Sequence, residues 1–282
     1  MVGMAASGKF AMKFAMAVIA CLALRILIAA APPSPGYPAY QKANALFIAQ
    51  KFPESLAAID EALHLDPKLV PALTLKAKLA MAMNRFALAR QSLEQALAVD
   101  PKAQYALFLY GLEAFLTNDL QTALPRFRKA HRLNPSDPRA TLYLGLTTES
   151  LGQTAEALSL YEEAVRLEQT AGTPQAETFL PGARLLLLLG RLDESERWIR
   201  QALRLAPRVR DPHFELARLL LRKGDAAQAA EEGETALSLP GGIVTDAQVH
   251  YLLIRAWQQS GKPDRAAQHA AALRAIETPA GR

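Results

Sequence analysis

One sequence pattern recurs at a nearly constant step over most of the 282 residues. A small residue marks the late part of each unit, at Ala62, Ala96, Ala130, Ala164, Ala202 and Ala236, with Leu273 in the same place in the last unit. The steps between these positions are 34, 34, 34, 38, 34 and 37 residues. A period of this length indicates an array in which no unit can bury its apolar face alone, so each is stabilised by stacking on its neighbours.

Three further columns keep the same register. A second small residue precedes the first in each unit, at Ser55, Ala89, Ala123, Ala157, Ser195, Ala229 and Ala266. A third column falls in the first half of each unit, at Ala43, Ala77, Gly111, Gly145, Ala183, Ala217 and Ile254. Between these two columns lies a turn column, at Gln50, Asn84, Asn118, Gly152, Gly190, Gly224 and Gly261. Because Gly and Asn tolerate a left-handed backbone, the columns predict two antiparallel helices joined by a tight turn in every unit.

Four of the units end on a proline, in Asp66-Pro67, Asp100-Pro101, Asn134-Pro135 and Ala206-Pro207. With its four columns and this closing proline, the chain resembles the tetratricopeptide repeat family. The resemblance implies an all-α fold, an α-α superhelix of about seven helix-turn-helix repeats. The repeats are expected at about 36–69, 70–103, 104–137, 138–171, 176–209, 210–243 and 247–279, in a solenoid that spans 38–279. Two insertions, around 169–174 and 240–245, are expected to form loops between repeats.

The first 31 residues form a separate segment. Lys9 and Lys13 precede an apolar run, and the small residues at 29–31 lead into a Pro-rich linker at 32–37. A basic start, an apolar stretch and small residues before the linker predict a cleaved secretory signal peptide. Residues 14–31 are also long enough for an uncleaved membrane anchor, and an amphipathic soluble extension is a third alternative. Either of the first two interpretations places the chain in the periplasm or the cell envelope, with a membrane tether in the case of an anchor.

Cys21 lies inside this segment, after a box that resembles a lipoprotein cleavage site. The residues after it stay apolar, whereas a lipidated cysteine normally leads a polar tether. This favours an ordinary thiol in an apolar helix over a lipid-modified one.

Charge and residue types exclude several classes of function. Beyond residue 31 the chain has 29 basic and 27 acidic residues, so it lacks the general positive field that nucleic-acid binding requires. A single cysteine excludes a disulfide scaffold and a cysteine-based zinc site. The five histidines do not pair with one another or with carboxylates at metal-ligand spacing, and motifs for a nucleophile elbow or a dinucleotide are missing. The sequence therefore predicts a protein without enzymatic activity, cofactor or metal.

The resemblance implies that the first helices of successive repeats line a concave groove that binds a partner. Ten residues are the candidates for that contact: Phe108, Leu112, Phe115, Leu146, Arg184, Phe214, Arg218, Arg222, Tyr251 and Arg255. Guanidinium groups bind carboxylates through two parallel hydrogen bonds, so we expect a peptide with an apolar anchor and an acidic or carboxyl-terminal group. The alternative is that the aromatic residues are ordinary packing and that the arginines pair with local acids.

The prediction for function is a non-catalytic scaffold of the cell envelope that binds a protein or peptide partner. A second hypothesis is an accessory subunit that presents substrates to a separate envelope enzyme. A third is a homo-oligomer formed through the seventh repeat, since few residues follow it that could cover its apolar face. The last helix is instead expected to cover itself with a polar face of Arg265, Gln268, His269 and Arg274.

Overall fold

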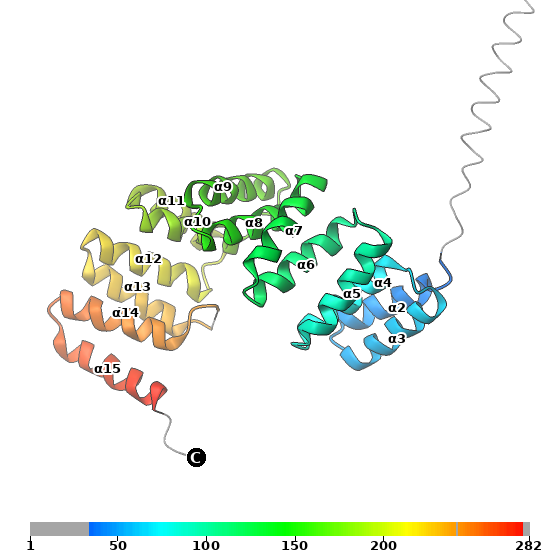
Figure 1. Ribbon diagram of the computed structural model, residues 1–282. Helices are drawn as coiled ribbons and strands as arrows, with labels where there is room; N and C mark the ends of the chain where they lie inside the picture. The colour runs from blue at the N-terminus through cyan, green and yellow to red at the C-terminus, as the bar shows by residue number, and fades with distance from the viewer. Residues whose placement is uncertain (1–33, 241, 279–282) are drawn as a thin grey trace, which may run out of the picture. The chain divides into compact units, whose positions relative to one another are not determined.

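The computed structural model describes residues 34–240 and 242–278. Within this range every regular element is an α-helix, and the helices form seven consecutive helix-turn-helix pairs (Figure 1). The predicted all-α fold of helix-turn-helix repeats is thereby confirmed. The interpretations of residues 1–31, including that of Cys21, concern residues outside the described range. In the part of the chain that the structure describes, no helix combines the length and apolarity needed to cross a membrane.

The chain divides into two units between Pro101 and Lys102. The first unit contains α2 (Tyr37–Ile48), α3 (Phe52–Leu65), α4 (Val70–Ala82) and α5 (Phe86–Val99). The second unit contains α6 (Gln104–Leu116), α7 (Leu120–Leu133), α8 (Pro138–Ser150), α9 (Thr154–Thr170), α10 (Ala176–Leu188), α11 (Leu192–Leu205), α12 (Arg210–Lys223), α13 (Ala226–Ser238), α14 (Asp246–Gln259) and α15 (Pro263–Glu277). Within each unit every helix packs on the next, and in the second unit α12 also contacts α10 and α14.

The predicted turn column is confirmed by the backbone. Each of its seven members has a positive φ, between 56° and 89°. The residue that follows then donates its N–H to a carbonyl in the last turn of the preceding helix, as Arg85 does to Ala80 at 2.8 Å and Asp119 to Ala114 at 2.7 Å. This geometry satisfies carbonyl groups that would otherwise lack partners at the helix end. The chain can therefore reverse direction within three residues.

The small residues of the first helices lie where the two helices of a pair cross. Gly111 and Gly145 leave so little space that an added Cβ would lie 2.7 Å from Phe127 and 2.8 Å from Tyr161, respectively. Both aromatic side chains are fully buried. The large residues of the second helices therefore fill the space above the small residue of their own repeat, and Phe127 also stacks on Tyr143 of the next repeat.

The first insertion differs from its expected structure. Part of it lengthens α9, which has 17 residues where the other second helices have 13 to 15. The buried Glu168 explains why the chain then turns, because its carboxylate accepts hydrogen bonds from the Gln175 backbone at 2.9 Å and the Thr178 hydroxyl at 2.8 Å. These two bonds tie the end of α9 to the start of α10.

Candidate functional site

The ten predicted groove residues all lie on first helices of the second unit. Helix α6 carries Phe108, Leu112 and Phe115, α8 carries Leu146, α10 carries Arg184, α12 carries Phe214, Arg218 and Arg222, and α14 carries Tyr251 and Arg255. The structure separates them into two sets. Phe108 and Phe115 of α6 and Leu146 of α8 contribute to packing, whereas the residues on α12 and α14 line an open pocket. Arg184 of α10 does not line that pocket.

The aromatic residues of α6 belong to a packed cluster. Phe108 is 5% exposed, and its ring centroid lies 5.9 Å from that of Phe127 and 5.7 Å from that of Tyr143. Phe115 meets the edge of Tyr143 at 5.9 Å. Such aromatic pairs add about 0.5–1.5 kcal/mol each beyond the burial of their area. The cluster therefore stabilises the third and fourth repeats and leaves Phe108 little surface for a ligand.

Leu112 and Leu146 are half-buried. Leu146 packs against the core cluster that contains Tyr161 and Leu185. Neither leucine lines the pocket described below.

Two of the predicted arginines share one buried carboxylate. Glu215 of α12 accepts a hydrogen bond from Arg218 Nη1 at 2.8 Å, and its Oε1 lies 4.0 Å from Arg184 Nε. Burial raises the pKa of Glu215 above its ordinary value, and the two guanidinium groups offset this only in part. Arg184 and Arg218 thus neutralise an acid of the chain itself.

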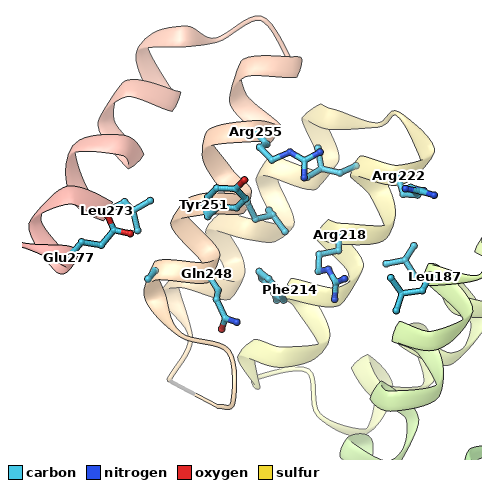
Figure 2. A pocket seen from close by; sticks show the side chains of 13 residues that line it. Leu187, Phe214, Arg218, Arg222, Gln248, Tyr251, Arg255, Leu273 and Glu277 are labelled. Carbon is cyan, nitrogen blue, oxygen red and sulfur yellow. The ribbon is translucent and has the colours of Figure 1, made fainter. Parts of the chain in front are cut away.

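A pocket of about 550 Å³ opens between α10, α12, α14 and α15 (Figure 2). Its apolar lining consists of Leu187, Leu188, Phe214, Leu221, Ala247, Tyr251, Leu252 and Leu273. Two of these side chains remain largely open to solvent, since Leu188 is 67% and Tyr251 is 62% exposed. Burying a large apolar side chain is worth roughly 1.5–3 kcal/mol, so this open surface offers an anchor site for an apolar group.

The charged residues of the pocket lie on two sides of this apolar surface. Arg218, Arg222 and Arg255 project from α12 and α14, and Glu277 lies across from them on α15 (Figure 2). Within the described residues, neither Arg222 nor Arg255 forms an ion pair or a side-chain hydrogen bond, and both are exposed. The pocket therefore combines an apolar floor with two positive charges that no acid of the described chain balances.

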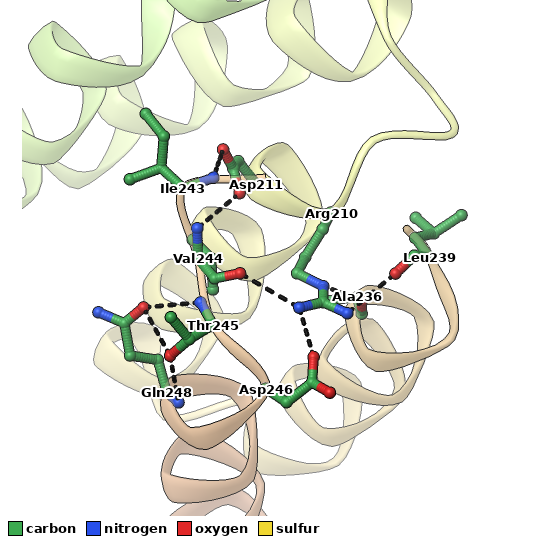
Figure 3. Close-up of polar contacts among 9 residues, drawn as sticks. All are labelled: Arg210, Asp211, Ala236, Leu239, Ile243, Val244, Thr245, Asp246 and Gln248. Carbon is green, nitrogen blue, oxygen red and sulfur yellow. Dashed lines mark hydrogen bonds and ion pairs between the residues drawn. The ribbon is translucent and has the colours of Figure 1, made fainter. Parts of the chain in front are cut away.

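The loop that leads into α14 is fixed from the start of α12 (Figure 3). The buried Arg210 donates hydrogen bonds of 3.0–3.2 Å to three backbone carbonyl groups, those of Ala236, Leu239 and Val244. Asp211 accepts hydrogen bonds of 3.0 Å from the backbone N–H groups of Ile243 and Val244. A Cβ at Gly242 would lie 2.5 Å from this carboxylate, so a larger residue there would displace Asp211 from its present position. Residues 243 and 244 of the second insertion are thus fixed by α12, and Gln248 of the following helix, α14, lies at the edge of the pocket.

Sequence reasoning missed part of the pocket because it considered only one face of the first helices. It did not identify Leu188, Gln248, Leu273 or Glu277 as site residues. Leu188 lies at the end of α10, and Leu273 and Glu277 lie on a second helix, α15. The only sequence signal for α15 was the seventh repeat's departure from the small-residue columns, which put Leu273 where alanine is usual.

The histidines make contacts that their spacing in the sequence does not reveal. His213 lies 2.7 Å from Glu232, and His250 lies 3.0 Å from His269. The expected place of His269 on the exposed face of α15 is wrong, because its side chain is 11% exposed and turns toward α13 and α14. Across residues 34–240 and 242–278, no three His, Cys, Asp or Glu side chains are grouped as metal ligands would be.

Comparisons with known proteins agree with this architecture. A family model described as tetratricopeptide repeat matches residues 74–125, 112–174 and 180–243, and a second model of the same description matches residues 247–272. No curated protein sequence matches the chain.

Several solved structures have a similar fold. The crystal structure of the APC/C hetero-tetramer Cut9–Hcn1 matches with a TM-score of 0.60 and 18% identity, over 82% of this chain and 44% of that one. A tetratricopeptide repeat protein from Parabacteroides merdae matches with a TM-score of 0.58 and 18% identity, over 83% and 88% of the two chains. PilF from Pseudomonas aeruginosa matches with a TM-score of 0.51 and 18% identity, over 87% and 93%. At these identities the likeness shows the fold alone.

Proposed function

The chain belongs to the tetratricopeptide repeat family, whose model matches more than half of its residues, and from this membership we propose that it binds an acidic segment of a partner protein in the pocket of its last three repeats. Proteins with this fold generally mediate protein–protein interaction. The protein then acts as a non-catalytic scaffold, and the pocket lined by α10, α12, α14 and α15 is its binding site.

One observation carries the proposal: Arg222 and Arg255 lie beside an open apolar surface without an acidic partner in the described chain. The contrast with Arg184 and Arg218 is informative, because those two arginines are already engaged by Glu215. Two free guanidinium groups suit a carboxylate, which each can bind through paired hydrogen bonds. The floor formed by Tyr251 and its neighbours suits a large apolar side chain next to that carboxylate.

The opposite side of the pocket gives the bound segment a direction. Glu277 lies away from the arginines (Figure 2), so it repels an acidic residue and favours a basic or neutral one. A segment with its acid near Arg222 and Arg255 is therefore preferred over the reversed orientation.

Reversal of the two free charges tests the proposal. The probe is a set of fluorescein-labelled peptides that combine Leu or Phe with Glu or Asp, and binding is read by fluorescence anisotropy. Each charge-assisted hydrogen bond is worth about 1.5–3 kcal/mol, so Arg222→Glu with Arg255→Glu should weaken binding of the best peptide at least about 100-fold. Both side chains are exposed, so the variant should keep its helicity, which circular dichroism measures.

A matched control changes the same charge elsewhere. Arg204 at the end of α11 and Arg208 after it are exposed and lie outside the pocket. Arg204→Glu with Arg208→Glu should leave peptide affinity within about twofold. Equal loss in both double variants would mean that net charge, and not the pocket, governs binding, and the proposal would be abandoned.

We further propose that the scaffold belongs to the cell envelope. The support is the basic, apolar and small-residue pattern of residues 1–31, which suits an export signal or an anchor. Amino-terminal sequencing of the protein purified from its own cells distinguishes a cleaved segment from a retained one, because cleavage near residue 31 would remove the apolar run.

A further inference from the structure

Helix α15 forms one side of the pocket but is held by little apolar packing. It contributes Leu273 and Glu277 to the lining. Ala266 is its one buried residue, and all of its other residues are exposed or half-buried. A helix with so little buried apolar area opens at a low free-energy cost unless polar contacts hold it. The contacts of His269 are therefore a large part of what keeps this side of the pocket in place.

These contacts form a chain of polar groups across three helices. His269 Nδ1 of α15 lies 3.0 Å from His250 Nδ1 of α14. The other ring nitrogen of His269 lies 3.0 Å from Glu234 Oε1 of α13, and the same oxygen accepts a hydrogen bond from Trp257 Nε1 at 3.1 Å. His250 is 9% exposed, so solvent replaces these contacts poorly.

The number of protons bound to the two imidazole rings determines whether the contacts between His250, His269 and Glu234 can form. With both rings neutral, His269 donates from Nε2 to the Glu234 carboxylate, and its bare Nδ1 accepts from His250 Nδ1–H. One added proton is tolerated, because one Nδ1–H can still point at one bare Nδ1. A second proton places two N–H donors against each other at 3.0 Å with no acceptor between them, and two positive rings then repel. The contact between α14 and α15 is therefore compatible with at most one charged ring.

We propose that the His250–His269 pair is a proton-sensitive tether that holds α15 against the pocket near neutral pH and releases it in mild acid. The consequence for ligand binding rests on the proposed function of the pocket, whereas the tether itself does not. Release of α15 removes Leu273 and Glu277 from the lining, so the pocket loses one apolar contact and the acid that sets the direction of a bound segment.

The charges around His250 come from every helix that packs against it. Burial lowers its pKa below the ordinary value of 6.5, and His269 lowers it further. Asp246 of α14 and Glu234 of α13 act in the opposite direction but do not cancel the effect. Lys262 lies before α15 and Arg265 on its first turn, and both cations sit over the Trp257 ring, where they add positive charge near the pair.

The sign of the pH effect follows from this direction. When α15 is detached, His250 is solvated and takes up a proton at higher pH than it does in the packed state. As the pH falls below 6.5, the detached state therefore binds more protons than the attached state. Over this range the attached state loses stability relative to the detached state, until the pH reaches the lowered pKa of His250. Each unit by which that pKa is lowered changes the equilibrium by up to about tenfold.

Two readouts on the full chain measure the tether without any ligand. Hydrogen–deuterium exchange of residues 263–277, corrected for the intrinsic pH dependence of exchange, should show protection that falls severalfold, up to a limit of about tenfold, between pH 7.5 and pH 5.5. The protein has two tryptophans, so 5-fluorotryptophan gives two ¹⁹F resonances. That of Trp257 should shift over the same range, whereas that of Trp198, which packs on Phe179 in α10, should not.

His250→Asn is the decisive variant, because the Asn amide can replace Nδ1–H as a donor to His269 but does not titrate. Its α15 should stay protected at pH 5.5. His131→Asn is the matched control: His131 is half-buried and, like His250, uses Nδ1, toward the Thr141 hydroxyl at 3.1 Å, but it lies on α7. This control should keep the pH response of the unmodified protein.

Each possible result either supports the His250–His269 tether or overturns it. A response that persists in His250→Asn, or a native α15 that stays protected at pH 5.5, overturns the tether. If His250→Asn is already open at pH 7.5, His269→Gln replaces it, because Gln keeps the donor to Glu234 and removes the second imidazole ring. Failure of the acidic peptides to bind at pH 7.5 would remove the proposed function, while the exchange data would still decide whether the tether exists. Where the peptides bind, their affinity should fall with pH in parallel with the protection of α15.

Discussion

At the scale of single residues, the side chain at the small-residue position of the first helix matches in size the side chain 16 residues later in most of the repeats. The pairs are Gly111–Phe127 and Gly145–Tyr161 where the first residue is glycine, and Ala43–Ile59, Ala77–Leu93 and Ala183–Ile199 where it is alanine. An aromatic ring fits only where a Cβ is missing. In the seventh repeat the sizes are exchanged, with Ile254 on the first helix and Ala270 on the second. The sixth repeat is the exception, because both residues are small there, Ala217 and Gly233, and a Cβ at Gly233 would lie 2.7 Å from Leu253 of the next repeat. In the other repeats the crossing is kept close by the two sizes together and not by one position alone.

A double-mutant cycle tests this complementarity. Gly111→Ala places a Cβ 2.7 Å from the fully buried Phe127, and overpacking of this kind costs about 1–3 kcal/mol, against a gain of about 1 kcal/mol in helix propensity. Phe127→Leu alone leaves a cavity. Together they recreate the Ala77–Leu93 pair, so urea denaturation should show the double variant to be at least about 1 kcal/mol more stable than the sum of the single effects predicts. Additivity of the two changes would mean that the pair does not interact as described.

At the scale of elements, a fixed connection lets α12 determine where α14 begins. Arg210 and Asp211 bind the backbone on both sides of the inserted loop, and Asp246 of α14 pairs with Arg210 at 2.5 Å. A capping box between Thr245 and Gln248 then starts α14. The pocket depends on this arrangement, since Gln248 and Tyr251 both project from α14.

Arg210→Met should release the connection. It removes the donors of three carbonyl groups, each of which costs about 1–3 kcal/mol if buried without a partner. We expect the free energy of unfolding of the second unit to fall by at least about 2 kcal/mol, with faster hydrogen exchange concentrated at 242–250. Arg204→Met removes an exposed arginine from α11 and should cost less than about 0.5 kcal/mol. Similar effects of the two changes would contradict a structural role for Arg210.

The sequence could predict the helical pairs because backbone constraints leave a mark on residue type. A positive φ at each turn restricts the choice at positions such as Asn84 and Gly190, so the turn column is visible without a structure. The pairing of Arg218 could not be predicted, because it depends on Glu215 being turned inward by the packing of α12 on its neighbours. The approach of His269 to His250 was hidden for the same reason, since contacts between helices follow from side-chain direction and not from spacing along the chain.

At the scale of the whole chain, the features that suit a partner lie in the second unit. Every residue that lines the pocket falls between Leu187 and Glu277. The proposal for location rests instead on residues 1–31, so the proposals for binding and for location stand on separate evidence. The near-neutral charge beyond residue 31 makes the local pair of free arginines, and not the general field, the source of attraction for an acidic partner.

Crosslinking at Tyr251 in cells tests the central claim most directly. A benzoylphenylalanine at this exposed pocket residue should capture a partner polypeptide whose crosslinked segment carries an acidic residue beside a large apolar one. The product should disappear when Arg222→Glu and Arg255→Glu are introduced together, and the same label at Tyr37, an exposed aromatic of α2, should not give it. A product at Tyr251 whose yield is unchanged by the two charge reversals, or one that forms equally at Tyr37, would contradict the account.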